Sequence, residues 1–352
     1  MTLSRTECTA LRGLAIVAIA LHNYCHFIGH IVKENEYLYQ VKNNDDLWRV
    51  LTHPDELLPV HLLSYFGHFG VPVFLFLSGF GLVMKYEASA APCEQCGVLS
   101  FLRYNYLKLL RMLIVGFVLF VMVDAVTPGR FHFYWYNVLA QLAMAINALP
   151  TNGVIWPGIY WFFGLMMELY VVYRLLLYRR HWLYVVSLVV ACWLAQVFCD
   201  PEGKLLDYLR YNFIGSMLPF GAGILFARYG HRLGTSERPR YQWALMALTA
   251  IALVLLMSFS FYSWLWIPLF IIVGSIAIIK LLPSSLLNIA VWLGGLSAAI
   301  FVAHPISRRL LIVVAWKDGI YDGLMLYVVV TIGLSWAVKQ IIDRLPAPTS
   351  HH

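Results

Sequence analysis

Hydrophobic residues along the chain form long runs separated by short polar segments, a pattern that predicts membrane-spanning helices. A helix that crosses a bilayer needs about 20 mainly apolar residues. Ten segments meet this requirement: residues 11–29, 60–84, 104–126, 159–178, 182–199, 211–229, 241–259, 264–282, 291–315 and 322–342. We therefore expect an all-α polytopic membrane protein with about ten transmembrane helices.

An eleventh apolar segment, at residues 131–149, differs from the others. It is rich in aromatic residues and ends at Pro150. The positive-inside rule is satisfied better if this segment does not cross the bilayer. We therefore expect it to be interfacial or re-entrant.

The composition supports a membrane protein. The 352 residues are 61% hydrophobic and only 12% charged, whereas soluble domains carry about 25% charged residues. So few charges cannot cover a soluble globule of this size, which excludes an ordinary soluble fold.

The net charge of +7 could indicate a nucleic-acid partner. Because the basic residues are spread along one side of the predicted bundle, we expect no nucleic-acid binding.

The charges also predict an orientation. With the N-terminus inside, sixteen of the 25 basic residues and five acidic residues lie at the inner ends of the spans, against nine basic and twelve acidic residues outside. The inner basic residues are Arg5, Arg12, Lys85, Arg103, Lys108, Arg111, Arg174, Arg179, Arg180, Arg228, Arg232, Arg238, Arg240, Lys280, Lys339 and Arg344. This asymmetry predicts two cytoplasmic termini, in a multi-pass protein of the cell (inner, cytoplasmic) membrane.

The domain organisation is predicted to be simple. No internal repeat or long linker interrupts residues 1–345, which we expect to form one membrane domain. The tail 346–352 ends in Ser350-His351-His352, which is typical of a purification-tag remnant. The first span lacks an A-x-A-like cleavage site, so no cleavable signal peptide is expected. Cys93 and Cys96 supply only half of a zinc site, and we predict no metal.

Ionisable residues inside a span are expensive and therefore candidates for function. The first span holds Arg12, His22 and His26. His22 and His26 are one turn apart and can face one cavity. Two structural readings stay open, because Arg12 can extend to the inner interface and either histidine can make an interhelical hydrogen bond.

A cationic group opens the third span. Lys108 and Arg111 are three residues apart and share one helix face, and Arg103 precedes them by about one and a half turns. Such a group at the inner mouth suits a phosphate-bearing ligand. The positive-inside rule explains the same residues without a ligand.

Two more ionisable residues lie within spans. Glu168 is well inside the fourth span, where a carboxylate normally has a partner. His304 precedes Pro305 in the ninth span, and its imidazole can act chemically or pair with backbone freed at the proline kink.

Five motifs in this order resemble those of acyltransferase family 3, over about residues 5–345. They are Leu11-Arg12-Gly13 with His22, Phe74 to Phe80, Lys108-x-x-Arg111, Trp161 to Tyr170, and Gly295-x-Ser297 with His304-Pro305. The resemblance implies ten spans, a cytoplasmic N-terminus and acyl transfer across the membrane. The donor would be a cytoplasmic acyl-CoA, commonly acetyl-CoA, as co-substrate. The acceptor would be a hydroxyl of an extracytoplasmic glycan or lipid-linked sugar of the cell envelope.

The resemblance also assigns roles. Arg12, Arg103, Lys108 and Arg111 would hold the CoA phosphates, and His22 would be the base or transient acyl carrier, with weaker roles for His26, Glu168 and His304. Two features depart from the family. Nine residues rather than ten separate Arg12 from His22, so that Asn23 takes the usual histidine position, and Lys108 stands where the family often has arginine.

The chain ends after the tenth predicted span, without the esterase-like domain that some relatives carry. We therefore expect it to acylate its acceptor directly or to pass the acyl group to a separate extracytoplasmic transferase. Two other classes remain as alternatives: a transporter or flippase of a glycan or lipid, and a non-catalytic membrane sensor.

Overall fold

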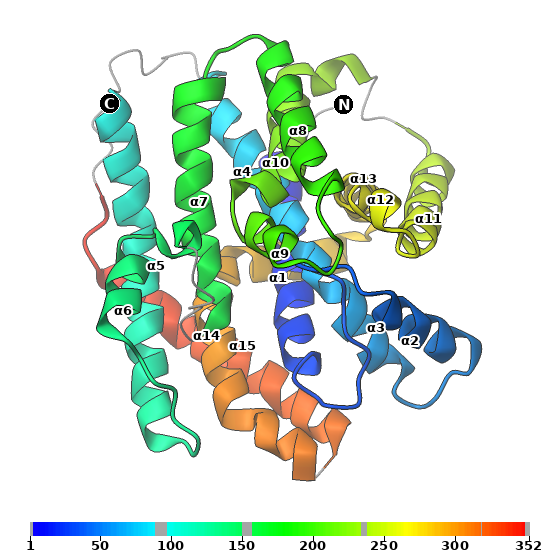
Figure 1. The fold of residues 1–352 in the computed structure, drawn as a ribbon, viewed down its shortest axis with the longest axis vertical. Helices are drawn as coiled ribbons and strands as arrows, with labels where there is room; N and C mark the ends of the chain where they lie inside the picture. The colour runs from blue at the N-terminus through cyan, green and yellow to red at the C-terminus, as the bar shows by residue number, and fades with distance from the viewer. Residues whose placement is uncertain (1–2, 89–96, 150–156, 234–237, 318, 349–352) are drawn as a thin grey trace.

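The computed structural model describes residues 3–88, 97–149, 157–233, 238–317 and 319–348. Within these ranges the protein is helical and contains no strand (Figure 1). The α-helices are α1 (Arg5–Cys25), α2 (Val41–Thr52), α3 (Leu58–Phe66), α4 (Gly70–Tyr86), α5 (Val98–Val126), α6 (Trp135–Leu142), α7 (Trp161–Val172), α8 (Trp182–Val197), α9 (Lys204–Tyr211), α10 (Phe213–Tyr229), α11 (Arg240–Met257), α12 (Phe261–Trp264), α13 (Ile267–Leu281), α14 (Ser284–Lys317) and α15 (Ile320–Arg344). Short helical turns η1 (Gly67–Phe69), η2 (Ile146–Ala148), η3 (Gly158–Tyr160), η4 (Tyr173–Leu177) and η5 (Gly230–Leu233) extend or connect them.

Within the described ranges, seven helical segments are long and apolar enough to cross a membrane. They are Arg5–Cys25, Leu58–Tyr86, Val98–Val126, Gly158–Leu177, Arg240–Met257, Ser284–Lys317 and Ile320–Arg344. The other three predicted spans coincide with the shorter helices α8, α10 and α13. The all-helical membrane fold is thus confirmed, whereas the count of ten spans, the orientation and the extent of the single domain stay predictions.

The aromatic-rich segment 131–149 contains only the eight-residue helix α6 and the turn η2, both too short to span. The start of α5 lies beside the end of α7, where the rings of Phe101 and Tyr173 are 6.2 Å apart. The two helices are therefore antiparallel neighbours, and the segment between them begins and ends on one side. The Cys93–Cys96 pair and the Ser350-His351-His352 end lie outside the described residues.

Ion pairs between distant residues agree with the predicted sorting of charges. Lys280 pairs with Glu7, Arg228 with Glu87 and Arg309 with Asp124. The first two pairs join residues that the sequence places on the inner side, and the third joins residues that it places on the outer side.

Two glycines let α1 and α14 approach closely. A Cβ atom added at Gly13 would lie 1.9 Å from the backbone oxygen of Ala290, and one added at Gly294 would lie 1.9 Å from that of Thr9. The glycine of the Leu11-Arg12-Gly13 motif is therefore a packing residue. This contact fixes α1 against the long helix that carries His304.

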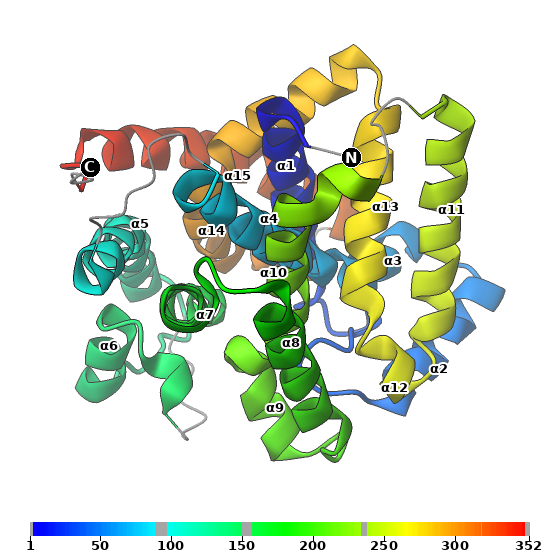
Figure 2. The same ribbon diagram turned by 90° about the horizontal axis from the view of Figure 1, so that it is seen from above.

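Further glycines bring α4 into contact with α1 and α10. Gly70 meets the Ala15 backbone of α1, and Gly67, in the turn before α4, meets the Cβ of His22. On the other side of α4, Gly79 meets the Phe220 backbone of α10. Figure 2 shows the result, with α1, α4 and α10 in the middle of the bundle, α5 to α7 on one side, and α11 and α13 on the other.

Candidate functional site

A cavity of about 260 Å³ lies at the end of the molecule where α1 begins. Arg12, Lys85 and Lys108 line it, and we call it the cationic cavity. The remaining wall is formed by Phe74, Leu77, Ser78, Gly81, Leu82, Tyr86, Tyr104, Asn105 and Tyr170. Three positive charges from three helices thus surround one space, which favours an anionic ligand.

Two cations predicted to join this group lie elsewhere. Arg111 donates a hydrogen bond to the backbone oxygen of Ile342 on α15. Arg103 is exposed and does not line the cavity. The expected face shared by Lys108 and Arg111 is therefore divided, because α15 packs against α5 at this level. Lys85 was not among the residues predicted for this site, but it lines the cavity. Its Nζ lies 4.4 Å from the centre of the Tyr104 ring.

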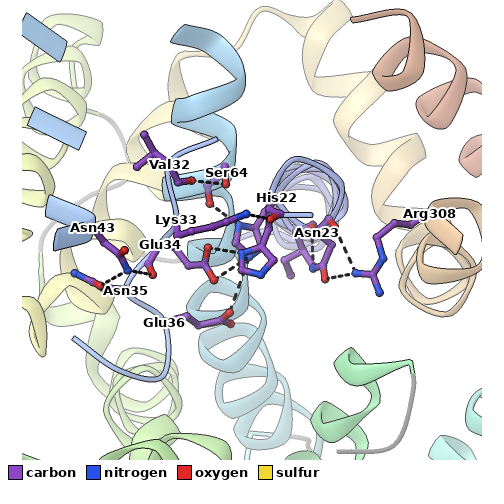
Figure 3. A network of polar contacts seen from close by, with 12 residues as sticks. His22, Asn23, Val32, Lys33, Glu34, Asn35, Glu36, Asn43, Ser64 and Arg308 are labelled. Carbon is purple, nitrogen blue, oxygen red and sulfur yellow. Dashed lines mark hydrogen bonds and ion pairs between the residues drawn. The ribbon is translucent and has the colours of Figure 1, made fainter. Parts of the chain in front are cut away.

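A cluster of histidines lies near the other end of α1, and Figure 3 shows one of them, His22, with its polar neighbours. The His22 side chain is only 6% exposed, and its Nδ1 is 2.6 Å from the backbone oxygen of Ser64. A carbonyl can only accept a hydrogen bond, so Nδ1 carries the proton and Nε2 keeps a lone pair in the neutral ring. The rings of His26 and His68 each lie 5.6 Å from that of His22.

The chain after α1 folds back against these histidines. Glu34 Oε2 is 2.7 Å from His26 Nδ1, and Glu34 Oε1 is 4.0 Å from His22 Nε2. Glu36 Oε2 is 3.9 Å from the same His22 nitrogen. Burial raises the pKa of Glu34, but the hydrogen bond from His26 and the neighbouring imidazoles outweigh it and lower that pKa to about 2. Burial and the charge of Glu34 raise the pKa of Glu36 to about 8.

Side-chain amides hold this returning segment in place. Asn43 Nδ2 donates to the backbone oxygen of Glu34, and Asn35 Nδ2 donates to Asn44 Oδ1. Trp264 Nε1 donates to the backbone oxygen of Asn35. Because α2 and the α12 region supply these partners, the position of the two carboxylates is set by the tertiary structure.

Asn23 and His304 lie on the α14 side of the cluster. Asn23 Oδ1 accepts a hydrogen bond of 3.1 Å from buried Arg308 on α14. His304 is fully buried, and its Nδ1 is 2.9 Å from the backbone oxygen of Ile300. Its Nε2 has no hydrogen-bond partner among the described residues.

Glu168 lies apart from the histidines. Its carboxylate accepts a hydrogen bond of 2.8 Å from the backbone N–H of Phe213, the first residue of α10. A carboxylate at a helix N-terminus is a stabilising cap. The observed contact therefore gives Glu168 a structural role.

A second pocket adjoins the histidine cluster, and we call it the aromatic pocket. Its wall includes Tyr37, Trp161 and Trp264 together with Glu36, His68 and Arg210. Arg210 stacks over the Trp264 ring at 4.5 Å. Burial lowers the pKa of Arg210 to about 10, which leaves it charged at neutral pH.

Chemically, the arrangement separates anion binding from proton transfer. Residues 12 and 22 are about 15 Å apart along the axis of α1. The cationic cavity can hold phosphate groups, and the Nε2 lone pair of His22 can accept a proton. The cluster of His22, His26 and Glu34 also contains ligand types suited to a metal ion.

Sequence reasoning missed Lys85, Glu34, Glu36, His68 and Arg308. Two of these had a signal, because His68 interrupts an apolar span and Arg308 follows His304 by one helical turn. The glutamates had none, since Lys33-Glu34-Asn35-Glu36 has the composition of a solvent-exposed loop.

Comparison with known families identifies the chain. The family model described as an acyltransferase domain matches residues 7–339, nearly the whole sequence. No curated protein and no solved structure gives a significant match. The matched range includes all but the first two residues of α1, together with the cationic cavity and the histidine cluster. The chain is therefore a multi-pass membrane protein that belongs to acyltransferase family 3.

Proposed function

We propose that the protein transfers an acyl group, specifically acetyl, from cytoplasmic acyl-CoA to a hydroxyl of an extracytoplasmic glycan or lipid-linked sugar. The observation that carries the proposal is the position of two sites along one helix. Arg12 lines the cationic cavity, and His22 lies in the buried cluster, about 15 Å further along α1. This separation suits a reaction whose two substrates come from opposite sides of a membrane.

The cationic cavity is the proposed donor site. Arg12, Lys85 and Lys108 would neutralise the CoA phosphates, with the guanidinium of Arg12 able to form paired hydrogen bonds. The extended pantetheine arm would then bring the thioester toward His22. Ser78, Leu77 and Phe74 of α4 lie on the wall of the same cavity. Because acyl-CoA is cytoplasmic, this donor site requires the cationic cavity to face the cytoplasm. The proposal therefore includes an inner-membrane location with both termini cytoplasmic.

His22 is the proposed base. Its Nδ1–H is held by the Ser64 carbonyl, so its Nε2 can accept the proton of the acceptor hydroxyl. The hydroxyl oxygen forms the new bond to the thioester carbonyl carbon, and the carbon–sulfur bond breaks. The CoA thiolate then leaves and takes up a proton. His26, His304 and Glu168 are secondary candidates, because their side chains contact other partners: Glu34, the Ile300 carbonyl and the Phe213 N–H, respectively.

The aromatic pocket is the proposed entrance for the acceptor. Aromatic rings stack on the apolar faces of sugars, and charged side chains bind their hydroxyls. Trp161 and Trp264 supply rings, and Glu36 and Arg210 supply polar groups. Glu36 and His68 belong both to this pocket and to the surroundings of His22. An acceptor hydroxyl can therefore reach the base from this side. The protein would acylate the glycan directly or pass the acyl group to a separate extracytoplasmic transferase.

The proposal is tested with purified protein in liposomes, by measuring CoA release from acetyl-CoA in the presence of envelope glycan. His22→Ala should lower kcat by about 100-fold or more, because the proton acceptor is lost. Lys85→Ala and Lys108→Ala should each raise KM for acetyl-CoA about tenfold, the effect expected from losing one charge-assisted hydrogen bond.

Lys42→Ala is the matched control, since Lys42 is exposed in the first turn of α2 and does not line the cationic cavity. It should leave KM and kcat unchanged. Wild-type rates in a folded His22→Ala/His26→Ala double variant would refute the base assignment. Glycan or lipid flux without CoA would instead favour a transporter.

A further inference from the structure

We propose that His22, His26 and Glu34 form a binding site for a divalent transition-metal ion of the zinc type, and that the bound ion switches the transferase off. One potential ligand atom from each residue lies within 4.8 Å of the other two. Zinc bonds to nitrogen and oxygen are about 2.0–2.2 Å, so the ligand atoms of a tetrahedral site lie about 3.3 Å apart. Small side-chain rotations would bring the three residues to that spacing.

The second observation is the orientation of His22. Metal-bound histidine usually donates its other ring N–H to a carbonyl or carboxylate, which fixes the ring. His22 already does so through Nδ1, at 2.6 Å from the Ser64 carbonyl. Its Nε2 therefore keeps a lone pair near two carboxylates, with Glu34 Oε1 4.0 Å away and Glu36 Oε2 3.9 Å away. Two acceptors face each other in a buried space, an arrangement that a cation between them would stabilise.

The surroundings supply a rigid frame for these ligands. The segment that carries Glu34 is held by Ser64 Oγ, which donates to the Val32 carbonyl at 2.7 Å, and by Asn43, which donates to the Glu34 carbonyl at 2.9 Å. The ammonium group of Lys33 donates hydrogen bonds to the backbone oxygens of His26 and Ile28, which further fixes this segment. Figure 3 shows Glu34 directed toward the His22 ring from the returning segment.

The ligand types select the metal. Two imidazoles and one carboxylate suit zinc and related transition metals better than magnesium or calcium, which prefer sites made of oxygen alone. A three-residue site leaves a fourth position for water or for the nearby Glu36. The buried ring of His68, which has no hydrogen-bond partner among the described residues, lies 5.6 Å from the ring of His22.

The effect on transfer follows from the atom that the ion would use. An ion on His22 Nε2 occupies the lone pair that accepts the hydroxyl proton, so metal binding and base catalysis exclude each other. This regulatory part rests on the proposed function, whereas the binding site itself does not.

Binding is tested with cobalt(II) as the probe, because its visible absorption reports tetrahedral coordination. All proteins compared carry Cys93→Ser, Cys96→Ser, His351→Ala and His352→Ala, so that these other metal-binding side chains cannot contribute. We expect one cobalt ion per chain, displaced by zinc and unaffected by magnesium. His26→Ala and Glu34→Gln should each weaken binding about tenfold or more. His30→Ala, an exposed residue just beyond the cluster, should leave it unchanged.

Activity is measured on the same proteins as the ratio of acetyl-transfer rates with and without stoichiometric zinc. We expect zinc to lower the wild-type rate at least about tenfold, a chelator to restore it, and His30→Ala to behave like wild type. Unchanged or faster transfer with zinc bound would overturn the regulatory part. Absence of cobalt binding, or equal binding in the His26 and Glu34 variants, would overturn the site. Cobalt binding without any acyl transfer would refute only the proposed function.

Discussion

At the scale of single residues, the neighbours His22 and Asn23 point to different partners. His22 lies against Ser64 and Glu34, whereas Asn23 accepts a hydrogen bond from Arg308 on α14. Successive residues of a helix are rotated by about 100°, so one position decides which neighbour a side chain meets. The family spacing favours a histidine at position 23, but the contacts around position 22 are the ones suited to a base.

This difference predicts the outcome of exchanging the two residues. The double variant His22→Asn/Asn23→His places an imidazole at the family spacing, where it would face Arg308 instead of Glu34. We expect acetyl transfer by the double variant to stay at the level of the single variant His22→Asn, about 100-fold or more below wild type. CoA release and thermal stability are measured for both variants, so that misfolding is recognised. Recovery of transfer in the double variant would show that spacing from Arg12, and not the Glu34 contact, defines the base.

The sequence predicted part of the candidate site, and the reason lies in where each residue comes from. Arg12 and Lys108 could be predicted because a charge in an apolar helix is conspicuous, and the structure places both in one cavity. Glu34 could not, because its burial depends on amides of α2 and on Trp264, far away in the sequence. Arg111 was expected to share the phosphate-binding face of Lys108, but in the structure it contacts the Ile342 carbonyl. This contact depends on how α15 packs against α5, which the sequence does not reveal.

At the scale of elements, close helix contacts hold the histidine cluster together. Gly13 and Gly294 allow α1 and α14 to meet backbone to backbone. In a membrane, helices associate through such packing, since burial of apolar side chains away from lipid gains little. A larger residue at either glycine would push apart the two helices that carry His22 and His304.

Two adjacent glycines on α14 allow a matched test of this packing. A Cβ atom at Gly294 would lie 1.9 Å from the Thr9 backbone oxygen, whereas one at Gly295 would meet nothing within 4 Å. We expect Gly294→Ala to destabilise the protein by about 1–3 kcal/mol through overpacking. Gly295→Ala should have no such effect. Thermal unfolding in detergent measures both, and equal melting temperatures for the two variants would contradict the packing role.

The helices were easier to predict than their lengths and connections. Each predicted span coincides with a helix, because about 20 apolar residues in lipid must satisfy their backbone hydrogen bonds internally. The segment between the first two predicted spans contains α2, where Asn43 and Asn44 are buried. Buried amides give no hydrophobic periodicity, so this element and the carboxylates that it positions could not be derived from the pattern.

At the scale of the whole molecule, the two cavities follow one another along α4. The α4 residues that line the cationic cavity run from Phe74 to Tyr86, and those that line the aromatic pocket run from Val71 to Leu75. The helix thus connects the proposed donor side with the proposed acceptor side. The donor assignment requires the Lys85 end to face the cytoplasm, where acyl-CoA is available.

The predicted orientation in the membrane can be tested at two exposed residues, one on each side of the segment that contains α9 and α10. Glu202 follows α8, and Arg232 follows α10. In a background in which the native cysteines are replaced by serine, Glu202→Cys and Arg232→Cys provide single labelling sites. A membrane-impermeant maleimide added to intact cells should label position 202, and should label position 232 only after permeabilisation, because the positive-inside rule places the Arg232 loop in the cytoplasm. The serine background must retain acetyl transfer for the comparison to apply.

The reverse labelling pattern would put Arg12, Lys85 and Lys108 on the outer side, away from acyl-CoA, and would refute the donor site. Labelling of both positions in intact cells would show that the short helix α10 does not cross the membrane, and would reduce the number of spans.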